Sequence, residues 1–251
     1  MTKKFIGIYD VFSAMVVHKT HNDLFLSGFS YTASAYGLAD IGFMTWQDVI
    51  DIAARIKSRC KDTNLLVDID DGFGGSEIAG YVTKELEKIG VWGVILEDQA
   101  RPKKCGHVDG KKVIQLDRYL EVLESVVKSS NNLRIIARTD STDHDEQTHR
   151  LKVFCQYPIY AALVDGISIE RYFELKKTSD KKLCLNYIYG GRAVVDSASL
   201  NLIDHLIFST SCIGSVGHAI VQTTNKIKDN SIFNSSQHLS LSEIRDITEK
   251  F

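Results

Sequence analysis

The sequence predicts a (β/α)₈ barrel, and three observations support this prediction. Eight short apolar runs rich in β-branched residues recur along the chain, amphipathic segments separate them, and polar residues follow many of the runs where each one ends. Alternating strands and helices of this kind form parallel sheets. The first run leads into YDVFSAM rather than a glycine-rich phosphate-binding turn, so a closed barrel is favoured over a doubly wound open sheet.

The strands are expected, in chain order, at 5–9, 24–27, 65–70, 91–97, 133–138, 161–165, 183–188 and 205–209. Between them, apolar residues return every three or four positions in segments such as WQDVIDIAARIKSR and SEIAGYVTKELEKI, which predicts helices with one buried face. Both prolines, Pro102 and Pro158, fall between expected elements. We expect residues 1–251 to form one barrel domain, in which 231–251 is a C-terminal linker and helix.

Composition excludes several classes of function. The chain has 30 basic and 32 acidic residues mixed along 251 positions, without the basic stripe that nucleic acid requires. No apolar stretch approaches the roughly 20 residues of a membrane span, and the first residues lack a signal-peptide run. Five scattered cysteines show no paired metal-binding spacing. We therefore expect a cytoplasmic protein with no nucleic-acid or membrane partner.

The stretch LLVDIDDGFGG suggests a metal site. Asp68 and Asp70 are two residues apart at the end of an expected strand, so both would face the same way, and Glu97 ends the next strand. Carboxylates facing a barrel interior are costly unless a hard cation binds their oxygens. We expect Mg²⁺, or alternatively Mn²⁺, bound directly by Asp70 and through water by Asp68 and Glu97. The alternative is an acidic turn in which Asp71 or Ser76 caps the next helix.

The following loop, RPKKCGHVDGKK, concentrates reactive side chains. Cys105 lies among Lys103, Lys104 and His107, a positive setting that favours a thiolate and allows it to exchange protons. The alternative is that Cys105 is an inert, small apolar residue. We expect the other four cysteines to be inert: Cys60, Cys155, Cys184 and Cys212.

Three later strand ends carry polar residues suited to binding a carboxylic acid. Arg138 can bind a carboxylate with two parallel hydrogen bonds, although it can equally pair with Asp140 for structure alone. Asp165 and Asn186 end the sixth and seventh strands and are candidate substrate contacts. Together these positions predict a small carboxylic acid, of the 2-oxo or 2-hydroxy class, as the substrate.

These blocks resemble the isocitrate lyase and phosphoenolpyruvate mutase superfamily from about Ser27 to Asp229. The similar blocks are LSGFSYTAS, ASAYGLADIGFMTWQDV, LLVDIDDGFG, VILEDQ, KKCGHVDGK and IIARTD, in the usual order. KKCGH is typical of the lyase branch, represented by isocitrate and 2-methylisocitrate lyases. The resemblance implies a Mg²⁺-dependent lyase that cleaves a carbon–carbon bond of a 2-methylisocitrate-like or substituted malate-type acid. Retro-aldol or retro-Claisen chemistry would give a 2-oxo acid and a second carboxylate.

The resemblance also implies roles for single residues. Cys105 would protonate the carbanion left by bond cleavage, supported by Lys103 and His107, while the three metal-site carboxylates would organise Mg²⁺. The implied substrate-binding positions are Ser27, Gly28, Phe29, Asp40, Gly106, Arg138, Asp165 and Asn186.

Several departures from the lyase pattern leave the substrate open. SGFS replaces a glycine-rich segment, so Phe29 and Ser30 would narrow or repolarise the pocket. Asp165 stands where methylisocitrate lyases have a glutamate, and STSCIGS lacks the arginine expected near Gly214. One alternative is a phosphoenolpyruvate mutase-like or carboxyphosphonoenolpyruvate-type phosphonomutase, since IVQTTNKIKDN is similar to that branch. A catalytically silent barrel is a further alternative, disfavoured because the motif residues are all present.

The C-terminal helix bears on assembly. Ser240 or Ser242 would cap it, and Leu241, Ile244 and Ile247 form a stripe that must be buried. The resemblance implies a homo-oligomer, a tetramer or dimer, in which a terminal helix is exchanged between subunits. Packing of the helix on its own barrel is the alternative.

Overall fold

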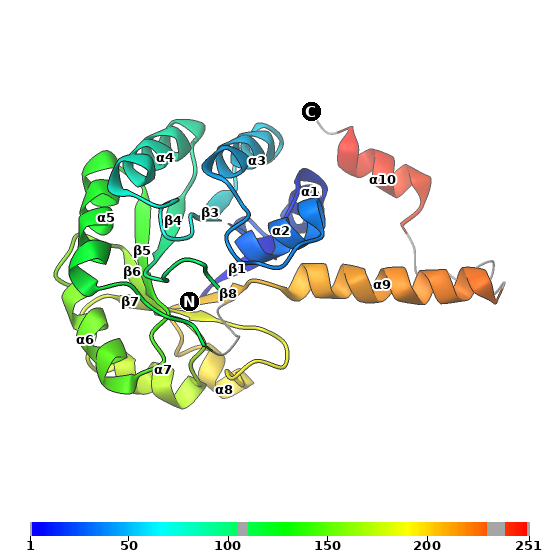
Figure 1. Cartoon of the computed structure of the whole chain (residues 1–251). Helices are drawn as coiled ribbons and strands as arrows, with labels where there is room; N and C mark the ends of the chain where they lie inside the picture. The colour runs from blue at the N-terminus through cyan, green and yellow to red at the C-terminus, as the bar shows by residue number, and fades with distance from the viewer. Residues whose placement is uncertain (1, 105–109, 230–238, 250–251) are drawn as a thin grey trace.

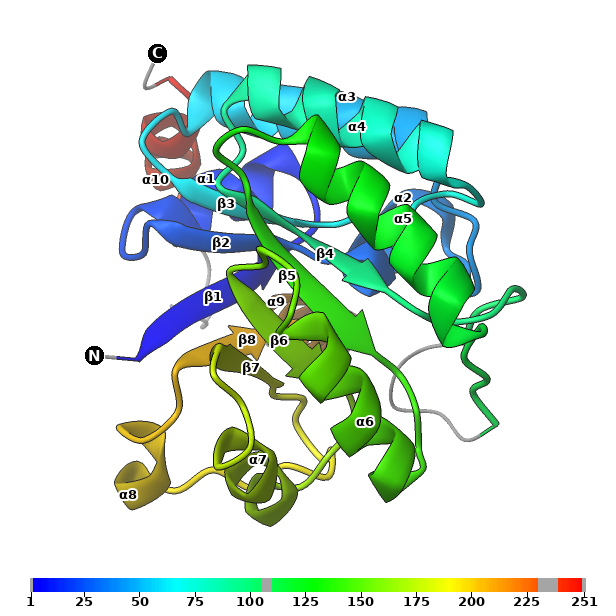
Figure 2. The same ribbon diagram turned by 90° about the vertical axis from the view of Figure 1, so that its left-hand side faces the viewer.

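The computed structural model describes residues 2–104, 110–229 and 239–249, and it confirms the predicted barrel (Figure 1). Eight parallel strands close in sequence order, because β1 pairs with both β2 and β8. The strands are β1 Lys3–Ile8, β2 Asp23–Leu26, β3 Asn64–Asp68, β4 Gly93–Glu97, β5 Arg134–Thr139, β6 Ala161–Val164, β7 Lys182–Asn186 and β8 His205–Phe208. Each overlaps one of the eight predicted runs. In Figure 2, β1, β4 and β5 all run from left to right, tilted relative to one another.

Helices follow the strands and cover the outside of the barrel. They are α1 Val11–His18, α2 Gly28–Tyr36, α3 Trp46–Arg59, α4 Ser76–Ile89, α5 Leu116–Ser129, α6 His144–Phe154, α7 Ile169–Lys176, α8 Ser197–Leu200, α9 Ser211–Lys228 and α10 Leu241–Thr248. The helices predicted from WQDVIDIAARIKSR and SEIAGYVTKELEKI match α3 and α4 residue for residue. Local chemistry sets these bounds: Thr45 and Asp48 form a capping box at the start of α3, and Gly90, with φ 83°, ends α4.

The core has two layers, because strand side chains alternate between the barrel interior and the helices. Leu65 and Val67 pack under the helices, whereas Leu66 between them packs inside the barrel. The interior cluster consists of Phe5, Phe25, Leu66, Ile95, Ile136, Ala161, Leu163, Cys184 and Ile207. The same alternation places the residue two positions after an interior residue at the mouth of the barrel, where the strands end.

The two C-terminal helices, α9 and α10, bury less of their surface on the barrel than the other long helices do. Figure 1 shows α9 extending away from the barrel, and none of its residues is buried. Its exposed apolar side chains include Val216, Ile220, Val221 and Ile227. No helix in the described part of the chain is long and apolar enough to cross a membrane.

Helix α10 returns to the barrel and lies beside α1. Ser240 caps it by accepting a hydrogen bond from the Glu243 backbone, so the first of the two predicted caps is correct. The predicted stripe is only partly buried within the chain: Ile247 is buried, but Leu241 is 84% exposed. The helix thus packs on its own barrel through one apolar residue.

Candidate active site

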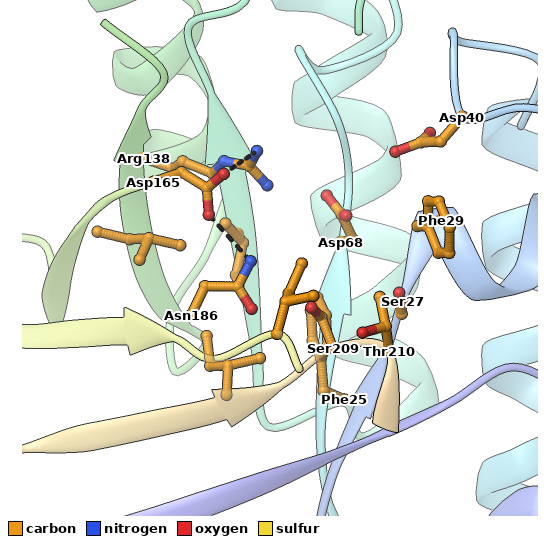
Figure 3. Close-up of a pocket in the computed structure, with 14 residues that line it drawn as sticks. Phe25, Ser27, Phe29, Asp40, Asp68, Arg138, Asp165, Asn186, Ser209 and Thr210 are labelled. Atoms are coloured by element: carbon orange, nitrogen blue, oxygen red, sulfur yellow. Dashed lines mark hydrogen bonds and ion pairs between the residues drawn. The ribbon is translucent and has the colours of Figure 1, made fainter. Parts of the chain in front are cut away.

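A cavity opens at the carboxyl ends of the strands (Figure 3). Several of its polar side chains come two residues after an interior core residue: Ser27 after Phe25, and Arg138 after Ile136. The predicted site residues that line it are Ser27, Phe29, Asp40, Asp68, Arg138, Asp165 and Asn186. The strand period therefore explains why residues scattered along the sequence meet here.

One side of the cavity is built by the start of α2. The Ser27 hydroxyl accepts a hydrogen bond from the Ser30 backbone and caps the helix. A side chain at Gly28 would press on Asp68, because an added Cβ would lie 3.2 Å from its Oδ2. Phe29 lines the cavity, as predicted. Ser30 is not among the lining residues, because its hydroxyl donates to the Ser209 carbonyl at 3.0 Å. It therefore does not repolarise the pocket as expected.

A cluster of carboxylates lies beside the cavity around a buried ammonium group. Lys103 Nζ contacts an Asp70 oxygen at hydrogen-bond range, Asp40 Oδ1 at 3.1 Å and Glu97 Oε1 at 3.7 Å. Asp68 lies at the end of β3 and also lines the cavity. The structure therefore brings the three predicted metal ligands together with Lys103 and Asp40.

Asp70 reaches this cluster by a turn rather than by the strand alternation used to predict it. Strand β3 ends at Asp68, whose Oδ1 accepts a hydrogen bond from the Asp70 backbone at 3.2 Å, and Asp70 has a φ of 46°. The alternative, a capping turn, is wrong. Helix α4 begins after Gly75 without a side-chain cap, and Asp71 instead pairs with Arg101 at 2.6 Å.

Electrostatics show that the cluster carries more negative charge than Lys103 balances. Burial, followed by the charge of Asp70, raises the pKa of Asp68 to about 6. Burial also raises the pKa of Asp70 and places the pKa of Glu97 well above its usual value. For Lys103, burial acts to lower the pKa, but the surrounding carboxylates outweigh it and the pKa rises. An additional cation would stabilise this group of side chains.

The donor set fits a hard divalent cation such as Mg²⁺. It offers only oxygen ligands, and two buried atoms, Asp70 Oδ2 and Glu97 Oε2, have no hydrogen-bond partner among the described residues. Within residues 2–104, 110–229 and 239–249, no three acidic, histidine or cysteine side chains are arranged around a common point for a metal. Lys103 instead supplies the positive charge among these oxygens.

The opposite wall is organised by Arg138. Its Nε and Nη2 atoms bind the two Asp140 oxygens at 2.7 and 2.9 Å, and Nη2 also lies 3.3 Å from both Glu97 and Asp165. Asn186 donates to Asp165 at 2.9 Å (Figure 3). Both predicted roles of Arg138 are thus compatible with the structure, since it pairs with Asp140 and also faces the cavity.

Sequence comparison agrees with this geometry. A family model described as phosphoenolpyruvate phosphomutase matches residues 2–155. The petal death protein of Dianthus caryophyllus is 30% identical over 238 residues, covering 89% of this chain and 73% of that protein. The chain belongs to the phosphoenolpyruvate phosphomutase family. The predicted membership of the isocitrate lyase and phosphoenolpyruvate mutase superfamily is therefore confirmed.

A curated lyase and a solved structure are also similar to this chain. The 2-methylisocitrate lyase of Halalkalibacterium halodurans is 40% identical over 138 residues, which cover 54% of this chain and 45% of that protein. The chain thus spans less than half the length of this curated relative. A solved structure of oxaloacetate acetylhydrolase with the inhibitor 3,3-difluorooxalacetate has a TM-score of 0.91 at 25% identity, covering 98% of this chain and 88% of that one.

Three predicted site residues, Cys105, Gly106 and His107, lie outside the described residues. The four other cysteines are free thiols. Burial raises the pKa of both Cys60 and Cys184, which agrees with the expectation that they are inert.

The structure also adds site residues that the sequence did not single out. Ser209 and Thr210, at the end of β8, line the cavity. Lys111 reaches Asp140 at 2.8 Å, with its side chain almost completely buried. Its sequence neighbour Lys112 is exposed, so nothing in the string KK distinguished the two lysines.

Proposed function

We propose that this family member is a carbon–carbon lyase acting on a 2-methylisocitrate-like or substituted malate-type acid. The observation that carries the proposal is the pairing of two features in one cavity. Arg138 offers a cationic fork suited to a substrate carboxylate, and an oxygen-rich cation site begins at Asp68 on the facing wall. A 2-hydroxy acid presents the matching groups, a carboxylate beside an oxygen that can bind a metal.

Asp70, Asp68 and Glu97 would hold Mg²⁺. When bound there, the ion supplies Lewis-acid stabilisation of negative charge on a substrate oxygen.

The side chains of this protein would perform the remaining tasks. Arg138 binds the substrate carboxylate, and the start of α2 at Ser27 places a helix N-terminus beside the same anion. Phe29 covers part of the cavity and limits the entry of water. Lys103 keeps its proton, because the surrounding carboxylates raise its pKa, and so acts as a fixed positive charge.

The cleavage itself moves one proton off the substrate and one onto the product. The substrate hydroxyl gives its proton to water, a carbonyl forms, and the adjacent carbon–carbon bond breaks with its electron pair on the departing carbon. Cys105 then protonates that carbon, with His107 beside it in the KKCGH motif. The products are a 2-oxo acid and a second carboxylate.

Turnover assays test the proposal. The chain is incubated with Mg²⁺ and either 2-methylisocitrate or a series of substituted malates, and 2-oxo acid formation is followed with a coupled dehydrogenase. We expect turnover of at least one acid, its loss in EDTA, and a large decrease in Cys105→Ser. Carbon–phosphorus bond formation or cleavage in phosphorus NMR, without turnover of any of these acids, would favour the phosphonomutase alternative instead.

We further propose that the chain forms a homo-oligomer through α9. This 18-residue helix has no buried residue, yet it exposes Val216, Ile220 and Ile227, whose spacing puts them on one face. A helix with an apolar face needs a partner surface, and a second copy of this chain offers the same face to it. Sedimentation should show a dimer or tetramer that Ile220→Asp dissociates. A monomeric wild-type protein would contradict this assignment.

A further inference from the structure

Lys111 occupies an unusual place for a lysine. Its side chain is only 4% exposed, and its Nζ lies 2.8 Å from Asp140 Oδ1 and 3.8 Å from Asp165 Oδ2. Both acids are themselves buried at the mouth of the barrel. Burying an ammonium group is costly unless charged partners surround it, so this placement indicates a defined role for the charge.

The backbone around Lys111 is fixed on the barrel wall. The Lys112 carbonyl accepts a hydrogen bond from Ala100 at 2.8 Å, and the Ile114 amide donates to the Asp98 carbonyl at 2.9 Å. Arg150 on α6 donates to the Ile114 carbonyl at 2.8 Å. Lys111 therefore extends toward the site from an anchored segment and not from a free surface.

Lys111 and Arg138 share the same two acids. Arg138 binds Asp140 through Nε and Nη2, and Nη2 also approaches Asp165 and Glu97. Among the described residues, the hydrogen bonds and ion pairs of this guanidinium all use those two nitrogens, which leaves Nη1 for a ligand. Arg138 also lines the cavity.

Removing Lys111 would change the charge balance on this wall. Asp140 and Asp165 would then share the guanidinium of Arg138, which also lies near Glu97. Asp165 and Asp140 would draw Arg138 further toward themselves, and a substrate carboxylate would meet uncompensated negative charge. With Lys111 present, part of the charge of Asp140 and Asp165 is neutralised by its ammonium group.

We infer that Lys111 is a positioning residue for substrate binding. It neutralises Asp140 and Asp165, so that Arg138 keeps its orientation and its Nη1 edge for the substrate carboxylate. The inference rests on the proposed function insofar as the bound ligand is a carboxylic acid, but it does not depend on which carbon–carbon bond is cleaved.

The experiment compares four variants of the full chain. Lys111→Met and Lys111→Gln remove the charge, Lys111→Arg retains it, and Lys112→Met removes the neighbouring exposed lysine as a matched control. Oxalate binding in saturating Mg²⁺ is measured by calorimetry, because it reads carboxylate binding without turnover. Values of kcat and KM are measured with the best acid substrate, and thermal melting reports folding.

The expected result is specific to the charge at position 111. Lys111→Met and Lys111→Gln should weaken oxalate binding by about tenfold or more, the effect of losing one charge-assisted hydrogen bond. KM should rise more than kcat falls, since a displaced Arg138 weakens binding of the substrate in its ground state as well. Lys111→Arg should recover most of the affinity, and Lys112→Met should bind as the wild type does.

Other outcomes refute the inference. Unchanged oxalate affinity in a folded neutral variant would overturn it, as would a failure of Lys111→Arg to recover binding or an equal loss in Lys112→Met. If the wild type binds oxalate but cleaves none of the acids, the proposed lyase activity fails while the binding comparison still decides the role of Lys111. Absence of oxalate binding by the wild type would refute both.

Discussion

Arg138→Lys is the substitution that tests the site most directly. It keeps the positive charge between Asp140, Asp165 and Glu97 but replaces a planar fork with a single ammonium. A lysine that pairs with Asp140 has no second edge to offer a substrate carboxylate. We therefore expect the variant to fold and its affinity for carboxylic acids to fall.

The magnitude follows from the contacts that are lost. One hydrogen bond between charged groups contributes about 1.5–3 kcal/mol, which is about a 10- to 150-fold change in kcat/KM. The parallel pair of bonds to Asp140, at 2.7 and 2.9 Å, becomes a single bond. The free energy of unfolding should therefore fall by a similar amount, about 1.5–3 kcal/mol.

The assay compares Arg138→Lys with Arg134→Lys. Both arginines belong to β5, but Arg134 is exposed at the other end of the strand and stacks on Trp92, 4.8 Å from the ring centre. Coupled 2-oxo acid formation gives kcat/KM, and urea unfolding gives stability. Arg134→Lys should keep full kcat/KM. A kcat/KM within twofold of the wild type for Arg138→Lys would show that the fork does not bind the substrate.

Three further predictions concern stability. Burial lowers the pKa of His205 to about 4, so the unfolded chain binds this proton more readily, and acid should destabilise the fold as pH falls below the unfolded value near 6.5. Through this group, the free energy of unfolding should fall by about 2 kcal/mol between pH 7 and pH 5. His205→Phe should remove that fall, which urea unfolding at several pH values measures. Lys103→Met leaves Asp70 without its buried partner, so the free energy of unfolding should fall by about 3–5 kcal/mol in EDTA. The loss should be smaller in Mg²⁺, and thermal melting with and without the metal measures the difference. Gly72→Ala should cost about 2–4 kcal/mol by the same unfolding measurement, because φ is 81° and the new Cβ would lie 2.7 Å from that of Ala79. An unchanged melting curve would contradict either of the last two.

Periodicity was sufficient to predict the fold. The strand runs and helical segments overlap the observed elements because each buries a face whose spacing is visible in the string. Helix α9 is the exception, since its apolar residues give the pattern of a packed helix although none of its residues is buried within the chain. A single sequence does not show whether the apolar face of a helix is covered by its own chain or by another molecule.

The site was predictable where it follows strand ends and not where it depends on long side chains. Asp68, Arg138 and Asn186 each come two positions after an interior residue, and counting along a strand finds them. Lys111, in the loop after β4, reaches Asp140 at the end of the neighbouring strand β5, and no spacing rule links these two positions. The turn at Asp70 was likewise missed, because a positive φ in a non-glycine residue has no sequence signal of its own.

The interior layer of the barrel also forms the floor of the cavity. Phe25, Ile95, Leu163 and Ile207 belong to both, and a strand rises only about 6.6 Å over two residues. Trimming Leu163 or Ile207 would therefore make room for a bulkier acid while opening a void in the core. If the proposed activity holds, a broader substrate range and resistance to heat would be coupled through the same few side chains.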